Sequence, residues 1–320
     1  MSRPTADASE RAADAASRGR LASGLPVSLA TLLGAVALVP TAGVLVLRLA
    51  RNAPVGLPSV ERAAAPAMTG LAAVVPALAV LGLAVDTDAR AERVALAAVG
   101  TFALVGAAAD AAWLPAAAAV LVGTSAALVV ALAERAHARV GPVDSLGVAF
   151  APVARPAAVA ALGALALAWS LAASAGLGTT TLRPAGAAVA FATLAALPLA
   201  RGVDGTVELG LWAVGAFGVV VAAASAPFVA GAVALVALGA GTVPLALLAL
   251  GTGGALATVV ADARRRAFGP AVAAALLLSA GVPATLPRAV AFALGLIVLV
   301  REWDGAGSEP GTTAGGVADA

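Results

Sequence analysis

The stretch VALAAVGTFALVGAAADAAWLPAAAAVLVGTSAALVVALA, residues 94–133, decides the fold. Asp110 carries the only charged side chain in these 40 residues. A helix that crosses a membrane needs about 20 apolar residues, so the stretch has the length of two spans and a tight turn. Trp113 and Pro115 follow Asp110, where an interfacial aromatic residue and a turn former are expected. We therefore predict a transmembrane hairpin with its tip at Asp110.

The composition extends this prediction to the whole chain. Of the 320 residues, 62% are hydrophobic and 11% are charged, whereas soluble globular proteins have about 45–50% and 25%. A soluble fold of this size could not cover its surface with so few charges, but lipid solvates apolar faces. The sequence predicts an all-α fold, a polytopic transmembrane helical bundle whose main partner is the lipid bilayer of the cell membrane.

Ala, Val, Leu and Gly dominate the chain, and Arg supplies all 19 basic residues. In this composition, though in no motif, the chain resembles uncharacterised multi-pass membrane proteins of haloarchaea. The resemblance implies a membrane bundle and no particular activity. The absence of Cys excludes structural disulfides, thiol catalysis and Cys-ligated metals. No basic stripe with interleaved aromatic residues is present, so no nucleic-acid partner is predicted.

Apolar runs predict where the chain crosses the membrane. The run 209–261 fits two long spans or three short ones, and the run 270–300 fits two short spans or one span and a re-entrant piece. The hairpin 94–133 supplies two more spans. The clear single spans are 25–47, 63–85, 156–176 and 184–200.

Arginines favour the cytoplasmic side of a membrane, so their distribution predicts the topology. With a cytoplasmic N-terminus and two spans in 209–261, 14 arginines lie inside and 5 outside, whereas three spans give 11 and 8. We therefore predict ten helices, within a range of nine to eleven, and both ends in the cytoplasm. Arg48, Arg51 and Arg62 lie on the outside in this arrangement and are its main misfit.

An internal repeat indicates how these helices are organised. The segments LAAVGTFALVGAAADA (96–111) and LWAVGAFGVVVAAASA (211–226) share ten of sixteen residues. Repeats are common in membrane folds, and this one predicts two parallel four-helix units. The expected parts are a polar cytoplasmic tail (1–24), a first unit (25–142), a second unit (143–269), a C-terminal transmembrane hairpin (270–301) and a disordered polar tail (302–320).

Few residues are candidates for a functional role. Asp110 is interpreted as a solvated hairpin tip, with a proton- or cation-binding acid as the alternative. His137 is the only histidine and is interpreted as a loop residue, although a pH-sensing role stays open. The cluster Arg264, Arg265 and Arg266 is interpreted as a topological anchor that attracts anionic headgroups.

No other motif indicates chemistry. The segment GTGGALATV (251–259) resembles a phosphate-binding loop but lacks its Lys, so its glycines are expected to serve helix packing or a local break. Pro40, Pro76 and Pro198 are expected to kink or end helices. We predict no catalytic residue, no cofactor and no metal site.

Two functions remain open from sequence. The first is a scaffold or accessory subunit of a membrane complex, which would have other membrane proteins as partners. The second is a transporter or permease for a small, weakly polar molecule. A polar cavity lined from both units would favour transport, whereas a solid core of Ala, Val and Leu would favour the scaffold.

Overall fold

The structure, a computed structural model, describes residues 27–52, 60–139, 146–203, 212 and 243–303. These residues form nine α-helices and one 3-10 turn, and they contain no strand. The prediction of an all-α bundle is thereby confirmed. The elements are α2 (Leu29–Asn52), α3 (Val60–Asp86), α4 (Arg90–Ala108), η1 (Asp110–Ala112), α5 (Trp113–Arg139), α6 (Leu146–Ser174), α7 (Thr179–Arg201), α10 (Val243–Arg264), α11 (Phe268–Ala280) and α12 (Leu286–Arg301).

Seven of the described helices, α2 to α7 and α10, are long and apolar enough to cross a membrane. The stretch 94–133 forms α4 and α5, with η1 between them at Asp110. This is the hairpin predicted from the sequence. The four single spans also appear at their expected places, as α2, α3, α6 and α7.

Several predictions fall on parts of the chain outside the described residues. The repeat segment 211–226 is one of them, apart from Trp212. The tail 1–24 and residues 304–320 also lie outside. Of the run 209–261, the structure describes only the part within α10 and Trp212. The number of spans in that run and the two parallel units therefore stay predictions.

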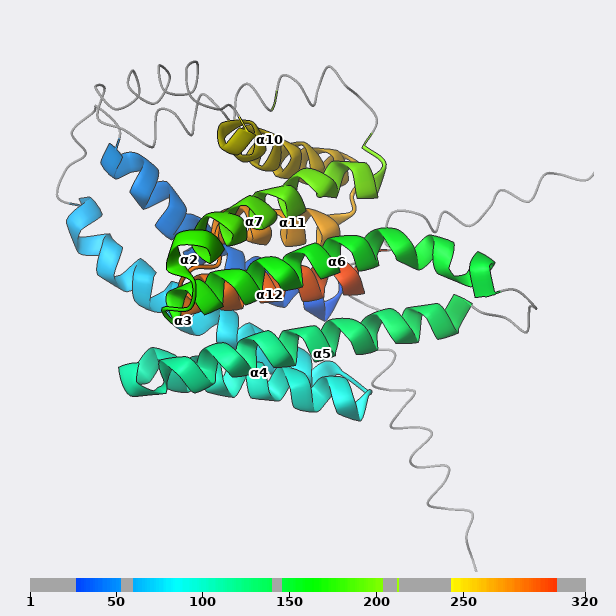
Figure 1. Ribbon diagram of the computed structural model, residues 1–320, viewed down its shortest axis with the longest axis horizontal. Coiled ribbons are helices and arrows are strands. Elements are labelled where there is room, and N and C mark those ends of the chain that lie inside the picture. Colours follow the sequence, from blue (N-terminus) through cyan, green and yellow to red (C-terminus); the bar gives the residue numbers. More distant parts are fainter. Residues whose placement is uncertain (1–26, 53–59, 140–145, 204–211, 213–242, 304–320) are drawn as a thin grey trace, which may run out of the picture.

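The centre of the described bundle is occupied by α12, which Figure 1 shows in orange and red among the other helices. It packs against α2, α3, α4, α5, α6 and α11. The apolar side chains from Ala289 to Val300 are each at most 1% exposed. Lipid could also solvate such an apolar helix, but here the neighbouring helices bury it on every side. The outer helices therefore separate α12 from lipid.

The α11–α12 hairpin is short but reaches from one end of α4 to the other. Its helices have 13 and 16 residues, or about 20 and 24 Å at 1.5 Å per residue. At one end Arg301 bonds to Glu92 near the start of α4. At the other end, a Cβ atom placed on Gly106 would lie 2.6 Å from Leu286. The run 270–300 thus forms two short helices, neither of which is among the seven candidate spans, so the choice between two short spans and one span with a re-entrant piece stays a prediction.

Small residues let neighbouring helices approach closely. A Cβ atom on Gly251 of α10 would lie 2.7 Å from the carbonyl oxygen of Phe191 in α7, and one on Gly163 of α6 would lie 2.5 Å from Leu296 of α12. Helix α10 continues without a break through Gly251, so of the two roles expected for the glycines of 251–259, packing is confirmed at this position. Pro40 and Pro76 lie inside the continuous helices α2 and α3, and neither ends its helix.

Candidate functional site

Charged side chains from four helices meet around the C-terminal end of α12, together with Thr87 of the α3–α4 connection. The charged side chains come from the start of α4 and from the ends of α5, α7 and α10. We call this set the polar layer. Its members are Thr87, Glu92, Arg93, Arg135, Arg201, Asp262 and Arg301.

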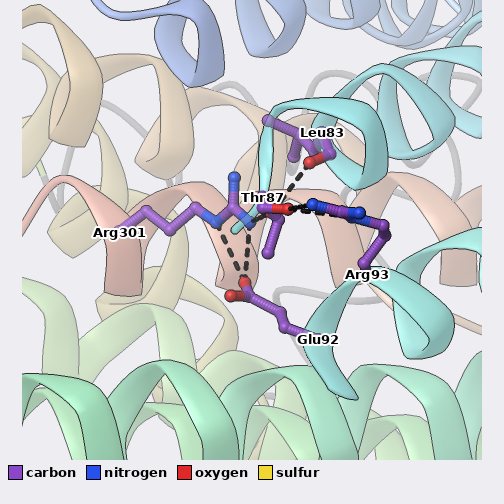
Figure 2. Close-up of polar contacts among 5 residues, drawn as sticks. All are labelled: Leu83, Thr87, Glu92, Arg93 and Arg301. Atoms are coloured by element: carbon purple, nitrogen blue, oxygen red, sulfur yellow. Dashed lines mark hydrogen bonds and ion pairs between the residues drawn. The ribbon is translucent and has the colours of Figure 1, made fainter. Parts of the chain in front are cut away.

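The first half of the polar layer joins α12 to the α3–α4 connection (Figure 2). Arg301 donates to Oε1 of Glu92 from Nε at 3.0 Å and from Nη2 at 2.8 Å, and it also bonds to the Thr87 hydroxyl. Arg93 holds the carbonyl of Thr87 through Nε at 3.0 Å and Nη2 at 2.6 Å. Glu92 is 3% exposed. A carboxylate this deeply buried is tolerated because the guanidinium lies directly against it.

The second half of the polar layer joins α7 to α10. Arg201 donates to both carboxylate oxygens of Asp262, at 3.1 Å from Nε and 3.0 Å from Nη2. The two side chains are 4% and 0% exposed. In this bidentate contact the two parallel N–H groups of the Arg side chain each donate to one carboxylate oxygen. Such charged hydrogen bonds are stronger than those between neutral groups. The Arg201 guanidinium also lies 5.4 Å from the centre of the Trp303 ring.

The same arginines bind the open end of α12. A helix leaves its last carbonyl oxygens without partners inside the helix, and its C-terminus attracts positive charge. Arg135 of α5 donates to the carbonyl of Arg301, the last residue of α12, at 2.7 Å, and Arg201 of α7 donates to that of Trp303, two residues past the helix, at 2.5 Å. Glu92 and Asp262 are thus bound to cations that also fasten the central helix, which is a structural role.

The residues singled out from sequence do not form one site. Asp110 lies in η1, at the opposite end of the bundle from the polar layer. His137 is exposed on α5, and its Nδ1 lies 2.9 Å from the carbonyl oxygen of Ala133 in its own helix. Each of these candidate roles stays a prediction.

Arg264, Arg265 and Arg266 are exposed at the end of α10, beside the polar layer. Arg265 donates to the carbonyl of Gly202 at 3.2 Å, which fastens the end of α7. Arg266 has a φ of 58°, the left-handed conformation that ends many helices and that usually falls to Gly. The cluster therefore makes local contacts between helix ends.

A hollow of about 460 Å³ lies next to the first half of the polar layer. Its lining includes the acidic residues Asp86, Asp88, Glu134 and Glu302. Within the residues that the structure describes, no three Asp, Glu, His or Cys side chains are grouped so that they could hold a metal ion. The lining also includes Glu92, Arg135 and Arg301 of the polar layer, so acidic and basic side chains share this opening.

Sequence reasoning missed the ion pairs of the polar layer. Glu92 precedes the run 94–133 and Asp262 follows the run 209–261, so each looks like an ordinary boundary residue. Their partners, Arg301 and Arg201, are distant in the chain. The available signal was that each acid lies at a helix end on the side predicted to be cytoplasmic, where arginines gather.

The model of one protein family matches residues 30–300, which hold most of every described helix and the whole polar layer except Arg301. The chain belongs to this integral membrane family of unknown function (DUF8068). Membership agrees with the seven candidate spans and shows that the protein is an integral, multi-pass membrane protein that lies in the lipid bilayer. No curated protein and no solved structure matches the chain.

Proposed function

We propose that the protein is a scaffold or accessory subunit of a complex in the cell membrane and acts through contacts with other membrane proteins. The filled centre of the bundle is the observation that supports this proposal. Between Ala289 and Val300, α12 places Ala, Val, Leu, Ile and Phe side chains on the axis, packed on every side. A passage for a polar solute would need polar groups there.

The polar layer supports the same proposal. In a transporter, buried charges bind the solute or exchange protons. Here Glu92 and Asp262 are bound to Arg301 and Arg201, which hold the end of α12 in place. These charges stabilise one packed arrangement of helices, which is what a scaffold needs.

Purification with a partner tests the proposal. A photo-crosslinking side chain at Val36 of α2 or Val122 of α5, which are 59% and 67% exposed, would face lipid or a partner. We expect at least one of these positions to crosslink the same membrane protein in near-equal amounts in native membranes. The matched control is Ala291 of α12, which is 0% exposed and should crosslink no other protein. If neither outer position captured a partner and the chain purified alone, the scaffold proposal would be wrong.

We further propose that the polar layer faces the cytoplasm, which places the N-terminus there. Arginines favour the cytoplasmic side of a membrane, and those of the polar layer lie at the same end as His137 and Arg265, whereas Asp110 lies at the other. The chain lacks Cys, so a single Cys introduced at each position can be labelled without background. We expect Asp110→Cys to react in intact cells, and His137→Cys and Arg265→Cys to react only after lysis. The reverse pattern would overturn the orientation.

The arrangement as two parallel four-helix units, 25–142 and 143–269, followed by the hairpin 270–301, is retained as part of this proposal. Its support is the sequence repeat, together with the sequential packing of α2, α3, α4 and α5 on one another. The haloarchaeal source also stays a proposal, supported by composition.

A further inference from the structure

A cavity lies at the Asp110 end of the bundle, where α11 ends before its neighbours do. Ser279, at the end of α11, donates to the hydroxyl of Thr41 in α2 at 3.2 Å. Helix α2 continues to Asn52, eleven residues past Thr41, whereas α11 ends at Ala280. The blue end of α2 and the adjoining end of α3 extend beyond the hairpin in Figure 1. A cavity of about 280 Å³ lies between α2, α3 and the start of α12.

The cavity has an apolar wall and a charged floor. Val44 and Leu45 of α2 and Ala72 of α3 form part of the wall. Thr285 and Arg288, at the start of α12, line the floor. Its volume is close to the lower end of the range of small-ligand pockets, about 300–1,000 Å³.

Arg288 differs from the arginines of the polar layer because its side chain has no bonding partner among the described residues. Across the described residues, its guanidinium makes no hydrogen bond and no ion pair. Arg93, Arg201 and Arg301, by contrast, are each held by two or more contacts. A half-buried guanidinium beside an apolar wall loses part of its hydration and gains no hydrogen bond in return. A bound anion would supply charged hydrogen bonds in place of the lost water.

The start of α12 adds two further donors to this floor. Thr285 occupies the position before the helix, but its hydroxyl caps no backbone N–H and is exposed. The first backbone N–H groups of a helix have no partners inside it, and the helix N-terminus carries a partial positive charge. In the first turn of α12, Pro287 has no N–H, so Leu286 and Arg288 are the residues before Ala289 that can offer one. Guanidinium, hydroxyl and helix end thus all favour a negatively charged oxygen at the same place.

The arginines that fit the topology worst lie at this end of the bundle. Arg48 follows Val44 by four residues in α2, and Arg51 is one residue before the end of that helix. Arg62 is near the start of α3. Together with Arg288 they are four of the five arginines predicted to lie outside. The preference of Arg for the cytoplasm does not explain why four of the arginines fall at this end.

We propose that this cavity binds an anionic amphiphile. Its phosphate or carboxylate group binds Arg288, Thr285 and the start of α12, and its apolar part lies against Val44, Leu45 and Ala72. The cavity is too small for a whole lipid, so acyl chains would extend from its mouth into the bilayer. This site is independent of the scaffold function proposed above.

Binding to the full-length protein in zwitterionic detergent tests the proposal. Native mass spectrometry would count bound molecules of dioleoyl phosphatidylglycerol, with dioleoyl phosphatidylcholine as the zwitterionic comparison and inorganic phosphate as the water-soluble anion. We expect one phosphatidylglycerol bound most tightly, and about tenfold weaker binding at that site in Arg288→Gln, as for the loss of one charged hydrogen bond. Arg183→Gln is the matched control, because Arg183 is exposed at the start of α7 at the same end.

A second variant separates loss of the site from loss of the fold. Ala72→Leu keeps every charge and fills the cavity, so it should also weaken phosphatidylglycerol binding while far-UV circular dichroism stays unchanged. If inorganic phosphate competes for the site, the proposal holds and a soluble anion can occupy it; if phosphate does not compete, the occupant is a lipid. Equal binding of phosphatidylcholine, or equal binding by Arg288→Gln and Arg183→Gln, would overturn it.

Discussion

Replacing Asp262 with Ala is expected to lower the free energy of unfolding by about 3–5 kcal/mol, the usual cost of removing one partner of a buried ion pair. The reason is the charge that remains. Arg201 is 4% exposed and gives two of its donors to Asp262. Without the carboxylate, that guanidinium stays buried beside α10 with only the Trp303 carbonyl and ring as partners. Unfolding by sodium dodecyl sulfate in mixed micelles measures the change.

The double variant Arg201→Met/Asp262→Leu is the control for this prediction. Replacing both members of a buried pair with apolar residues of similar volume is often close to neutral. We expect the double variant to recover at least half of the loss, since it leaves no unpaired charge and, beyond the ion pair, loses only the contacts of Arg201 with the carbonyl and the ring of Trp303. A single Asp262→Ala variant as stable as the wild type would show that the pair does not hold α7 against α10.

Replacing Phe292 with Ala is expected to lower the free energy of unfolding by about 3 kcal/mol, a value set by its burial. Phe292 is 0% exposed and is among the largest fully buried side chains of the described bundle. In water-soluble cores this substitution costs about 3–5 kcal/mol, partly from transfer and partly from the cavity left behind. In a membrane the transfer part is small, because lipid is as apolar as the core. The cavity part remains, which places the expected value at the lower end.

The matched control for Phe292 is Val122→Ala on α5. Val122 is 67% exposed, so its side chain makes little contact with the protein. Its truncation should change the free energy of unfolding by less than about 0.5 kcal/mol. Equal losses in the two variants, measured by the same unfolding assay, would mean that α12 is no better packed than the outer surface.

The outer helices could be predicted because hydrocarbon imposes a simple length rule. An apolar run of about 20 residues between charges has few alternatives to a spanning helix. The turn at Asp110 could be predicted as well, because an unpaired acid is costly in the middle of a membrane and an interface was the favoured place for the one acid in a 40-residue apolar run. Packing was one of the two roles expected for Gly251, the other being a local break, because a phosphate-binding loop needs a Lys that the chain lacks.

The central position of α12 could not be predicted in the same way. The sequence AVAFALGLIVLV (289–300) is as apolar as a lipid-facing helix, and in a membrane hydropathy does not distinguish a face against protein from one against lipid. The ion pairs of the polar layer could not be predicted from sequence for a related reason. Glu92 and Arg301 are 209 residues apart, and Arg201 and Asp262 are 61 apart, so only the folded arrangement brings them together.

The cavity at Arg288 shows a third limit of sequence reasoning. It exists because α11 ends at Ala280 while α2 and α3 extend further, and that difference depends on how the helices are aligned in space. The sequence did contain a related signal. Arg48, Arg51 and Arg62 disagreed with the topology rule, and the structure places a cavity with an unpaired Arg288 at their end of the bundle.

Labelling of the wild-type protein from within the lipid phase tests the central claim, that α12 is enclosed by the other helices. A hydrophobic diazirine that partitions into the bilayer inserts into side chains that face lipid, and mass spectrometry of peptides locates the label. We predict strong labelling on α2, α3 and α5, where Val36, Leu71 and Val129 are 59%, 48% and 66% exposed, and background labelling from Ala289 to Val300. Labelling of α12 as strong as that of α5 would contradict the account.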